Sequence, residues 1–148
     1  MFNRILTVCV GNVCRSPMAE GLLRARIGSR PGVTVESAGL AALVGNGAEP
    51  EAVELLAERG IDLTGHRARQ LNSSLVRAFD LVLVMEAGHQ RAVESMVLEA
   101  RGRVQRIGRW GDFDVPDPYR KGRASFEEAL TLIERGIGDF ERKFWGGV

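Results

Sequence analysis

Residues 81–85 form an unbroken apolar run, Leu-Val-Leu-Val-Met, with the length of a β-strand. A strand that is apolar at every position is typical of a parallel sheet covered by helices on both faces. Weaker strand patterns at 5–8, 33–37 and 104–107 alternate with helical patterns at 16–27, 51–59, from 86 to about 98, and 126–144. The alternation predicts an α/β fold: one domain, residues 1–148, with a four-stranded parallel sheet and helices on both faces.

The length and charge of the chain exclude several classes of protein. It has 148 residues, 45% of them apolar, and a net charge of +1, so no strong field attracts nucleic acid or anionic lipid. The apolar stretch at the N-terminus is too short for a signal peptide, and no run reaches membrane-spanning length. Cys9 and Cys14 lie too close in sequence to staple a secreted fold. We therefore expect a cytoplasmic protein without membrane insertion.

The segment from Cys9 to Ser16 connects the first strand to the first helix and is predicted to bind phosphate. The backbone N–H groups of such a loop converge with the helix dipole on one anion. Gly11 and Asn12 are residue types that accept the left-handed backbone of a tight ring of amides. The predicted phosphate-binding residues are Val10, Gly11, Asn12, Val13, Cys14, Arg15 and Ser16.

A thiol and a guanidinium at the two ends of this loop indicate chemistry on phosphorus. Cys9 is the predicted nucleophile, because amides, a helix N-terminus and Arg15 all stabilise a thiolate, although an inert core thiol is the alternative. Arg15 is predicted to bind two phosphoryl oxygens with its planar fork. Ser16 either caps a helix that has Pro17 in its first turn or donates its hydroxyl to the Cys9 sulfur. Cys14 either packs or traps oxidised Cys9 as a disulfide.

Together with three later segments, this loop resembles the low-molecular-weight protein tyrosine phosphatase family. The family signature, Cys-x5-Arg-Ser near the N-terminus, is matched from Cys9 to Ser16, and the resemblance covers essentially the whole chain. It continues through Ser37-Ala38-Gly39, Gly65-His66-Arg67-Ala68-Arg69 and Asp117-Pro118-Tyr119. It implies an enzyme that hydrolyses phosphotyrosine through a cysteinyl-phosphate intermediate, with no metal and no cofactor.

The resemblance also assigns residues outside the loop. It implies that Asp117 is the general acid, a choice that composition alone leaves open among Asp112, Asp114 and Asp117. Pro118 stiffens the chain beside Asp117. The implied loop supports are Asn12, Ser16 and Ser37, and the implied walls of the substrate pocket are Leu40 and Tyr119.

Two stretches, 37–45 and 116–121, resemble more specifically the bacterial members associated with capsule and exopolysaccharide production. Those members act on tyrosine autokinases of polysaccharide export, so a phosphotyrosine protein of that kind is the implied partner. Leu40 and Arg120 depart from the family pattern, which often has Thr and a second aromatic residue at these positions. Regulation through a second tyrosine is therefore not expected.

Three other functions fit the same loop less well. An arsenate reductase of this fold needs further cysteines to relay its disulfide, and the chain has only Cys9 and Cys14. Related protein-arginine phosphatases carry Thr where this chain has Val13, whose aliphatic side chain favours an aryl phosphate. A phosphotyrosine-binding module needs no nucleophile, so the presence of both Cys9 and Asp117 favours an enzyme.

The remaining polar residues receive structural or open assignments. His66 is predicted to be a structural hydrogen-bonding residue, and His89 is expected on a solvated helix face. No cluster of side chains at ligand spacing indicates a metal. Two interpretations are open for a further set of basic residues. They form either a basic rim that attracts a phosphorylated tail or an ordinary solvated charged face. These residues are Arg67, Arg69, Arg120, Lys121 and Arg123.

Overall fold

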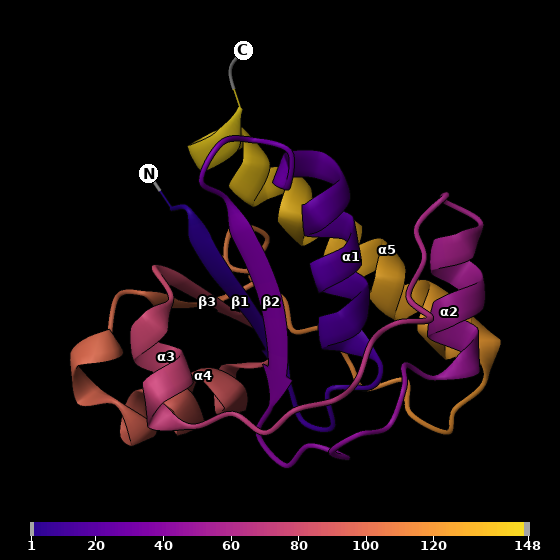
Figure 1. Ribbon diagram of the computed structural model, residues 1–148, viewed down its shortest axis with the longest axis horizontal. Helices are drawn as coiled ribbons and strands as arrows, with labels where there is room; N and C mark the ends of the chain where they lie inside the picture. Colours follow the sequence, from indigo (N-terminus) through magenta and orange to yellow (C-terminus); the bar gives the residue numbers. More distant parts are fainter. Residues whose placement is uncertain (1, 147–148) are drawn as a thin grey trace.

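The computed structural model describes residues 2–146 and contains a four-stranded sheet with helices on both faces (Figure 1). The strands are β1 (Arg4–Cys9), β2 (Thr34–Gly39), β3 (Leu81–Val84) and β4 (Val104–Arg106). The α-helices are α1 (Arg15–Ile27), α2 (Pro50–Ala57), α3 (Ser73–Ala78), α4 (Ala87–Met96) and α5 (Arg123–Phe140). A 3₁₀-helix (Leu98–Ala100) follows α4, and a π-helical turn (Glu141–Trp145) follows α5. The strand order is β2-β1-β3-β4 with every pairing parallel, which confirms the predicted fold class.

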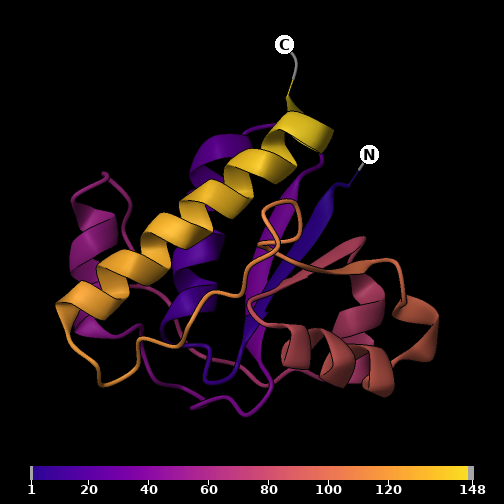
Figure 2. The ribbon, with the colours of Figure 1, turned by 180° about the vertical axis from the view of Figure 1, so that it is seen from behind.

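Side chains that alternate along the strands separate two apolar layers. In β1, Ile5 and Cys9 belong to the layer that packs against α1, α2 and α5, whereas Leu6 and Val8 belong to the layer beneath α3 and α4. Figures 1 and 2 show these two sets of helices on opposite sides of the sheet. Strands β1 and β3 lie at the centre of the sheet and contribute apolar side chains to both layers. This agrees with the apolar run at 81–85, which predicted a strand buried on both faces.

The parallel arrangement brings distant segments to one edge of the sheet. Strands β1, β2 and β3 end there together, with Cys9 beside Gly39 and Val8 beside Val84. The long segment before α5 returns to the same edge, where the N–H of Val115 donates to the carbonyl of Met85 at 2.9 Å. The carboxyl edge of a parallel sheet is where ligands of this fold class bind.

One helix was not predicted, and the bounds of the predicted helices are shifted by a few residues, as at the start of α5. Helix α3 was not predicted, because it has only six residues with Val76 as its one buried residue, too few for a helical period to emerge. Its signal is the cap: the Asn72 side chain accepts a hydrogen bond from the N–H of Leu75 at 2.9 Å. Helix α5 begins at Arg123 rather than Phe126, because its first turn is polar. Within residues 2–146 no helix combines the length and apolarity that crossing a membrane requires.

Candidate active site

Asn12 fixes the shape of the loop between β1 and α1. Its φ of 58° is the left-handed conformation predicted for the loop, whereas the neighbouring Gly11 does not adopt a positive φ. The Asn12 side-chain oxygen accepts from the backbone N–H of Arg69 at 2.9 Å. Its side-chain nitrogen donates to the hydroxyls of Ser16 at 2.8 Å and Ser37 at 2.9 Å. One buried amide thus ties the loop to β2 and to residue 69.

Ser16 lies in contact with the thiol and not at the helix cap. Its Oγ is 3.0 Å from the Sγ of Cys9, and it accepts the hydrogen bond from Asn12. Because Asn12 supplies a proton to this oxygen, the hydroxyl proton of Ser16 is free to point at sulfur. Helix α1 starts at Arg15, and Cys14 occupies the cap position without a side-chain cap. The prediction of Ser16 as an N-cap is therefore wrong, and its alternative role beside Cys9 remains.

A second set of polar groups, buried or half-buried, supports this network. The hydroxyl of Ser37 donates to the carboxylate of Glu20 at 2.6 Å. The Nε2 of His66 lies 2.7 Å from the carbonyl oxygen of Asn12, the kind of structural contact predicted for this histidine. These groups also line a groove of about 990 Å³ between α1 and β2, whose lining does not include the loop. Glu20, Ser37 and His66 thus support the loop through hydrogen bonds on the side away from the thiol.

Arg15 is buried at 1% exposure with a fixed guanidinium. Its Nη1 donates to the carboxylate of Glu86 at 2.5 Å and to the carbonyl of Val115 at 2.8 Å. Its Nη2 lies 3.9 Å from the Asp117 carboxylate, and its Nε has no hydrogen-bond partner among the described residues. A buried donor with this free proton can donate to an acceptor in the pocket, such as a phosphoryl oxygen.

Glu86 was missed by the sequence analysis. It directly follows the apolar run at 81–85 that contains β3, so a carboxylate at the end of the most apolar run was the signal that could have identified it. The parallel register places the end of β3 beside the end of β1, and hence Glu86 close to Arg15.

Asp117 is the only one of the three candidate acids that lines the pocket with Cys9. Its Oδ1 accepts from the backbone N–H of Tyr119 at 3.0 Å. Asp112 and Asp114 instead pair with Arg106 at 2.7 and 3.0 Å. Two of the three candidate acids, Asp112 and Asp114, are therefore engaged in ion pairs, and the third, Asp117, lies in the pocket with the thiol.

The pocket above the loop has a volume of about 150 Å³. It is lined by Cys9, Val10, Gly11, Val13, Cys14, Arg15, Ala41, Leu43, Asp117 and Tyr119. Tyr119 lies where the resemblance implied a wall. Leu40 does not: it packs against the layer beneath α3 and α4, on the other face of the sheet. The prediction of Leu40 as a wall is therefore wrong, because the chain turns after β2 so that Ala41 and Leu43 reach the pocket instead.

Two further titratable groups lie beside the site. Burial raises the pKa of the Cys14 thiol, and the neighbouring Cys9 adds to the rise, so Cys14 stays protonated. His89 is 7% exposed, with Nε2 3.6 Å from Glu86, so its expected position on a solvated face is wrong. Burial and the nearby charge of Arg15 lower the pKa of His89.

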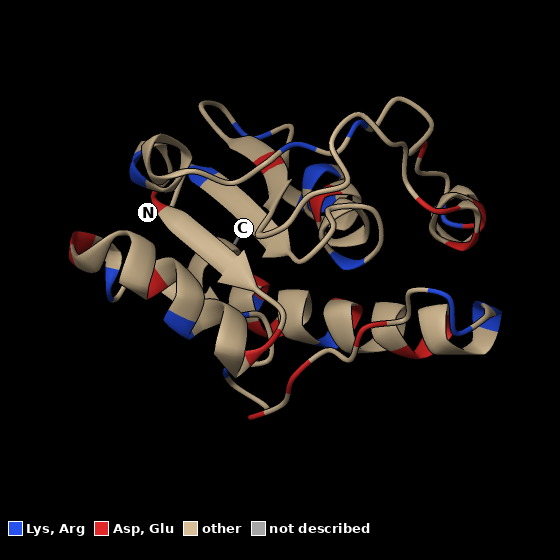
Figure 3. Ribbon diagram, turned by 90° about the horizontal axis from the view of Figure 1, so that it is seen from below, with Lys and Arg blue, Asp and Glu red and all other residues tan. Residues whose placement is uncertain are grey.

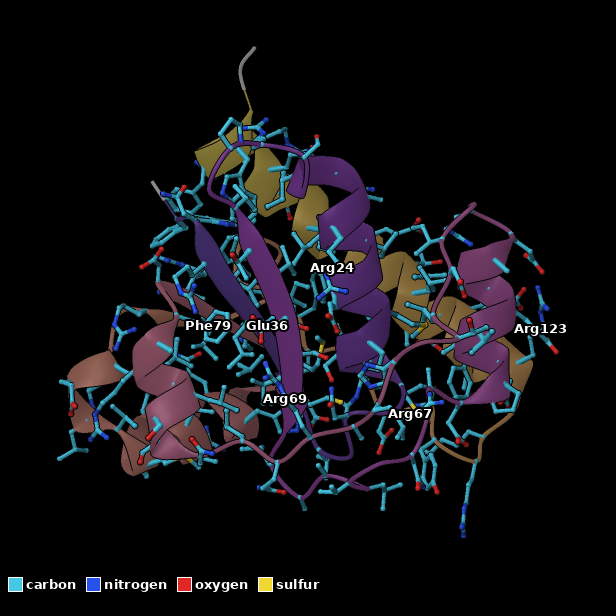
Figure 4. All side chains as sticks on the ribbon, in the orientation of Figure 1. Arg24, Glu36, Arg67, Arg69, Phe79 and Arg123 are labelled. Carbon is cyan, nitrogen blue, oxygen red and sulfur yellow. The ribbon has the colours of Figure 1, made fainter. Side chains whose placement is uncertain are left out.

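Two of the five basic residues considered for a rim form ion pairs. Arg69 pairs with Glu36 at 2.5 Å, and Figure 4 shows the two side chains close together at β2. Arg123 pairs with Glu58 at 2.6 Å. Figure 3 shows basic and acidic positions interspersed along the chain. Arg120, which stacks over the ring of Tyr119 at 5.1 Å, is the rim cation placed directly at the pocket wall. Among the described residues, no group of three or more His, Cys, Asp or Glu is placed to hold a metal ion.

Comparison with known proteins identifies close relatives of the whole chain. Residues 4–144 match the family described as low molecular weight phosphotyrosine protein phosphatase. The probable low molecular weight protein-tyrosine-phosphatase EpsP of Ralstonia nicotianae is 50% identical over 137 residues, which cover 93% of this chain and 92% of that protein. The low molecular weight protein-tyrosine-phosphatase Wzb of Escherichia coli K12 is 50% identical over 136 residues, covering 91% of this chain and 90% of Wzb.

Solved structures agree with this comparison. Wzb of Vibrio vulnificus in complex with benzylphosphonate superimposes with a TM-score of 0.90 at 41% identity, covering 97% of this chain and 100% of that one. Wzb of Escherichia coli K30 in complex with sulphate superimposes with a TM-score of 0.89 at 38% identity. The match covers 97% of this chain and 99% of the Wzb chain.

Proposed function

Because this chain belongs to the low molecular weight phosphotyrosine protein phosphatase family, we propose that it hydrolyses phosphotyrosine with Cys9 as nucleophile, Arg15 as phosphate clamp and Asp117 as general acid. The observation that carries the assignment is that these three residues line one pocket, although Asp117 lies far along the chain. The N–H groups of residues 10–16 bind the phosphoryl oxygens. Residues 1–148 act as a single phosphatase domain, without metal or cofactor.

In the first half-reaction, the Cys9 thiolate attacks phosphorus opposite the tyrosyl oxygen. The S–P bond forms as the P–O bond to tyrosine breaks, and Asp117 gives its proton to the departing oxygen. Arg15 stabilises the charge that spreads over the phosphoryl oxygens. The products are a cysteinyl phosphate and a neutral tyrosine side chain.

In the second half-reaction, water hydrolyses the cysteinyl phosphate. Asp117, now a carboxylate, takes a proton from the water that attacks phosphorus. The S–P bond breaks with its electron pair remaining on sulfur, and the hydroxyl of Ser16, 3.0 Å away, donates a hydrogen bond to the thiolate that forms. Asn12 supports this step by holding the Ser16 oxygen in place, and Ser37 in turn holds the Asn12 side chain.

The competing functions have less support. Both cysteines of the chain lie in the loop, so an arsenate-reducing relay has no further thiol to continue to. Val13 is 3% exposed and offers a guanidinium substrate no hydroxyl partner. A binding module has no use for an acid such as Asp117 beside a thiol with its own hydroxyl donor.

Asp117→Asn tests the proposal. We expect kcat/KM for phenyl phosphate to fall about 10²- to 10⁴-fold, the usual range of general acid–base catalysis. The loss should be smaller for para-nitrophenyl phosphate, because its leaving group is acidic enough to depart without a proton. Steady-state kinetics on aryl phosphates of graded leaving-group acidity measure this contrast.

Asp112→Asn and Asp114→Asn are the matched controls, because both carboxylates pair with Arg106 and neither lines the pocket. Their rates should depend on the leaving group as in the unmodified protein. If either control acquires the steep dependence and Asp117→Asn does not, the general acid has been assigned to the wrong residue.

We further propose that the physiological substrate is a tyrosine autokinase of polysaccharide export and that the protein acts in the cytoplasm. The resemblance of residues 37–45 and 116–121 to capsule-associated members supports this substrate. The identity of 50% to EpsP and Wzb agrees with it. A reactive thiol, with both cysteines free, suits a reducing compartment.

We expect phosphate release from a phosphotyrosine peptide of such an autokinase and much slower release from the same peptide with phosphoserine. The reason is depth: Cys9 is 2% exposed, at the floor of a pocket walled by Leu43 and Tyr119. A phosphoserine side chain is too short to bring phosphorus to the sulfur. Colorimetric phosphate release from the paired peptides gives the ratio, and equal rates would rule out a deep aromatic pocket.

A further inference from the structure

We propose that Glu86 is a positioning residue, which sets the orientation of the Arg15 guanidinium and thereby the affinity of the pocket for a phosphoryl group. The inference deepens the proposed function, since it rests on Arg15 being the phosphate clamp. Glu86 belongs to neither the loop nor the segment that carries Asp117. It precedes the first turn of α4, on the opposite face of the sheet from α1.

The hydrogen bonds of Arg15 show what the carboxylate does. A guanidinium has five N–H groups, of which Nη1 carries two. Both Nη1 protons have acceptors: the Glu86 carboxylate at 2.5 Å and the Val115 carbonyl at 2.8 Å. The Nε proton has none, and the carboxylate nearest to Nη2, that of Asp117, is 3.9 Å away. Holding Nη1 in this way leaves the Nε–Nη2 edge free, which is an edge that can bind two oxygens of one phosphoryl group.

The position of Glu86 is itself well determined. Its backbone carbonyl accepts from the N–H groups of His89 at 3.0 Å and Gln90 at 3.2 Å, which form the first turn of α4. The adjoining N–H of Ala87 donates to Asp114 at 3.1 Å. The backbone of Glu86 is therefore fixed at the start of α4, and from this position the carboxylate reaches Arg15 and can hold the guanidinium in one rotation.

A purely electrostatic role for Glu86 predicts the opposite result. If the carboxylate only offset the charge of Arg15, removing it would make the pocket more positive and tighten the binding of anions. If it orients the clamp, removing it lets the guanidinium rotate, and anions bind more weakly. The sign of the change in phosphate affinity separates the two roles.

The experiment is calorimetric titration of the folded protein with inorganic phosphate, for Glu86→Ala and Glu86→Gln. We expect Glu86→Ala to raise the phosphate Kd about 10- to 100-fold, the value of one hydrogen bond to a charged group. The phosphate Kd of Glu86→Gln should lie between those of the unmodified protein and Glu86→Ala, because the glutamine amide oxygen still accepts a hydrogen bond from Nη1 of Arg15. With para-nitrophenyl phosphate, kcat should fall together with kcat/KM. Unchanged or tighter phosphate binding in both variants would overturn the inference, and Glu86→Gln alone decides it if the alanine variant does not fold.

Glu134→Ala is the matched control, because the Glu134 side chain is 28% exposed, against 35% for Glu86, pairs with Arg59 at 2.8 Å at the surface and lines no part of the pocket. Its phosphate Kd should not change. Phosphate binding needs no turnover, so a failure of this inference can be told apart from a failure of the proposed function. If the proposed function fails, the unmodified protein binds phosphate without hydrolysing aryl phosphates.

Discussion

Cys9→Ser should abolish turnover of para-nitrophenyl phosphate, with kcat reduced on the order of 10⁵- to 10⁶-fold, as when other enzymes lose their nucleophile. The reason is that a serine hydroxyl in the same loop is far less ionised than a thiol and attacks phosphorus poorly. The fold and the binding of inorganic phosphate should persist. The backbone amides of the loop and the hydrogen bonds of Arg15 to Glu86 and Val115 do not involve the sulfur. Single-turnover kinetics and phosphate titration measure the two effects separately.

Cys14→Ser is the internal control for this experiment. Cys14 lies in the same loop, is equally buried, and has a thiol that burial keeps protonated. It contributes a backbone N–H and no nucleophile, so the variant should retain turnover. Substantial activity in Cys9→Ser, or complete loss in Cys14→Ser with activity left in Cys9→Ser, would place the nucleophile elsewhere.

The loop could be predicted from the sequence because its chemistry is local. Cys9, Asn12 and Arg15 lie within one turn between a strand and a helix, and their residue types alone indicate an anion and a nucleophile. Asp117 could not be chosen among three acids without the family resemblance. In the structure Asp112 and Asp114 pair with Arg106 and Asp117 lines the pocket with Cys9, which supports the proposed choice.

The errors have a different origin, because they concern residues whose environment depends on tertiary packing. The family resemblance implied Leu40 as a pocket wall, but the turn after β2 directs it to the opposite layer, and Leu43 lines the pocket instead. His89 was expected on a solvated helix face, whereas α4 packs it beside Glu86. Glu86 itself contacts Arg15 only through the pairing of β1 with β3, which no local pattern reports.

Arg15→Lys should lower kcat/KM for aryl phosphates on the order of 10³-fold, although the substitution keeps the positive charge. Removing one donor from a site that stabilises transition-state charge costs about 10²- to 10³-fold, and this change removes more than one. An ammonium group cannot hold Glu86 and Val115 while also presenting two parallel N–H groups to phosphate. Steady-state kinetics measure the loss, and thermal unfolding reports whether the fold survives.

Arg59→Lys provides the comparison, since Arg59 makes a surface ion pair with Glu134 through two of its nitrogens and touches no part of the pocket. Exposed pairs of this kind contribute about 0–1 kcal/mol, so its activity should match that of the unmodified protein. If Arg15→Lys were also nearly as fast, positive charge alone would suffice at this position. The assignment of Arg15 as a bidentate clamp would then be wrong. The proposed role of Glu86 would fail with it, because an ammonium group that rotates freely has no edge for a carboxylate to orient.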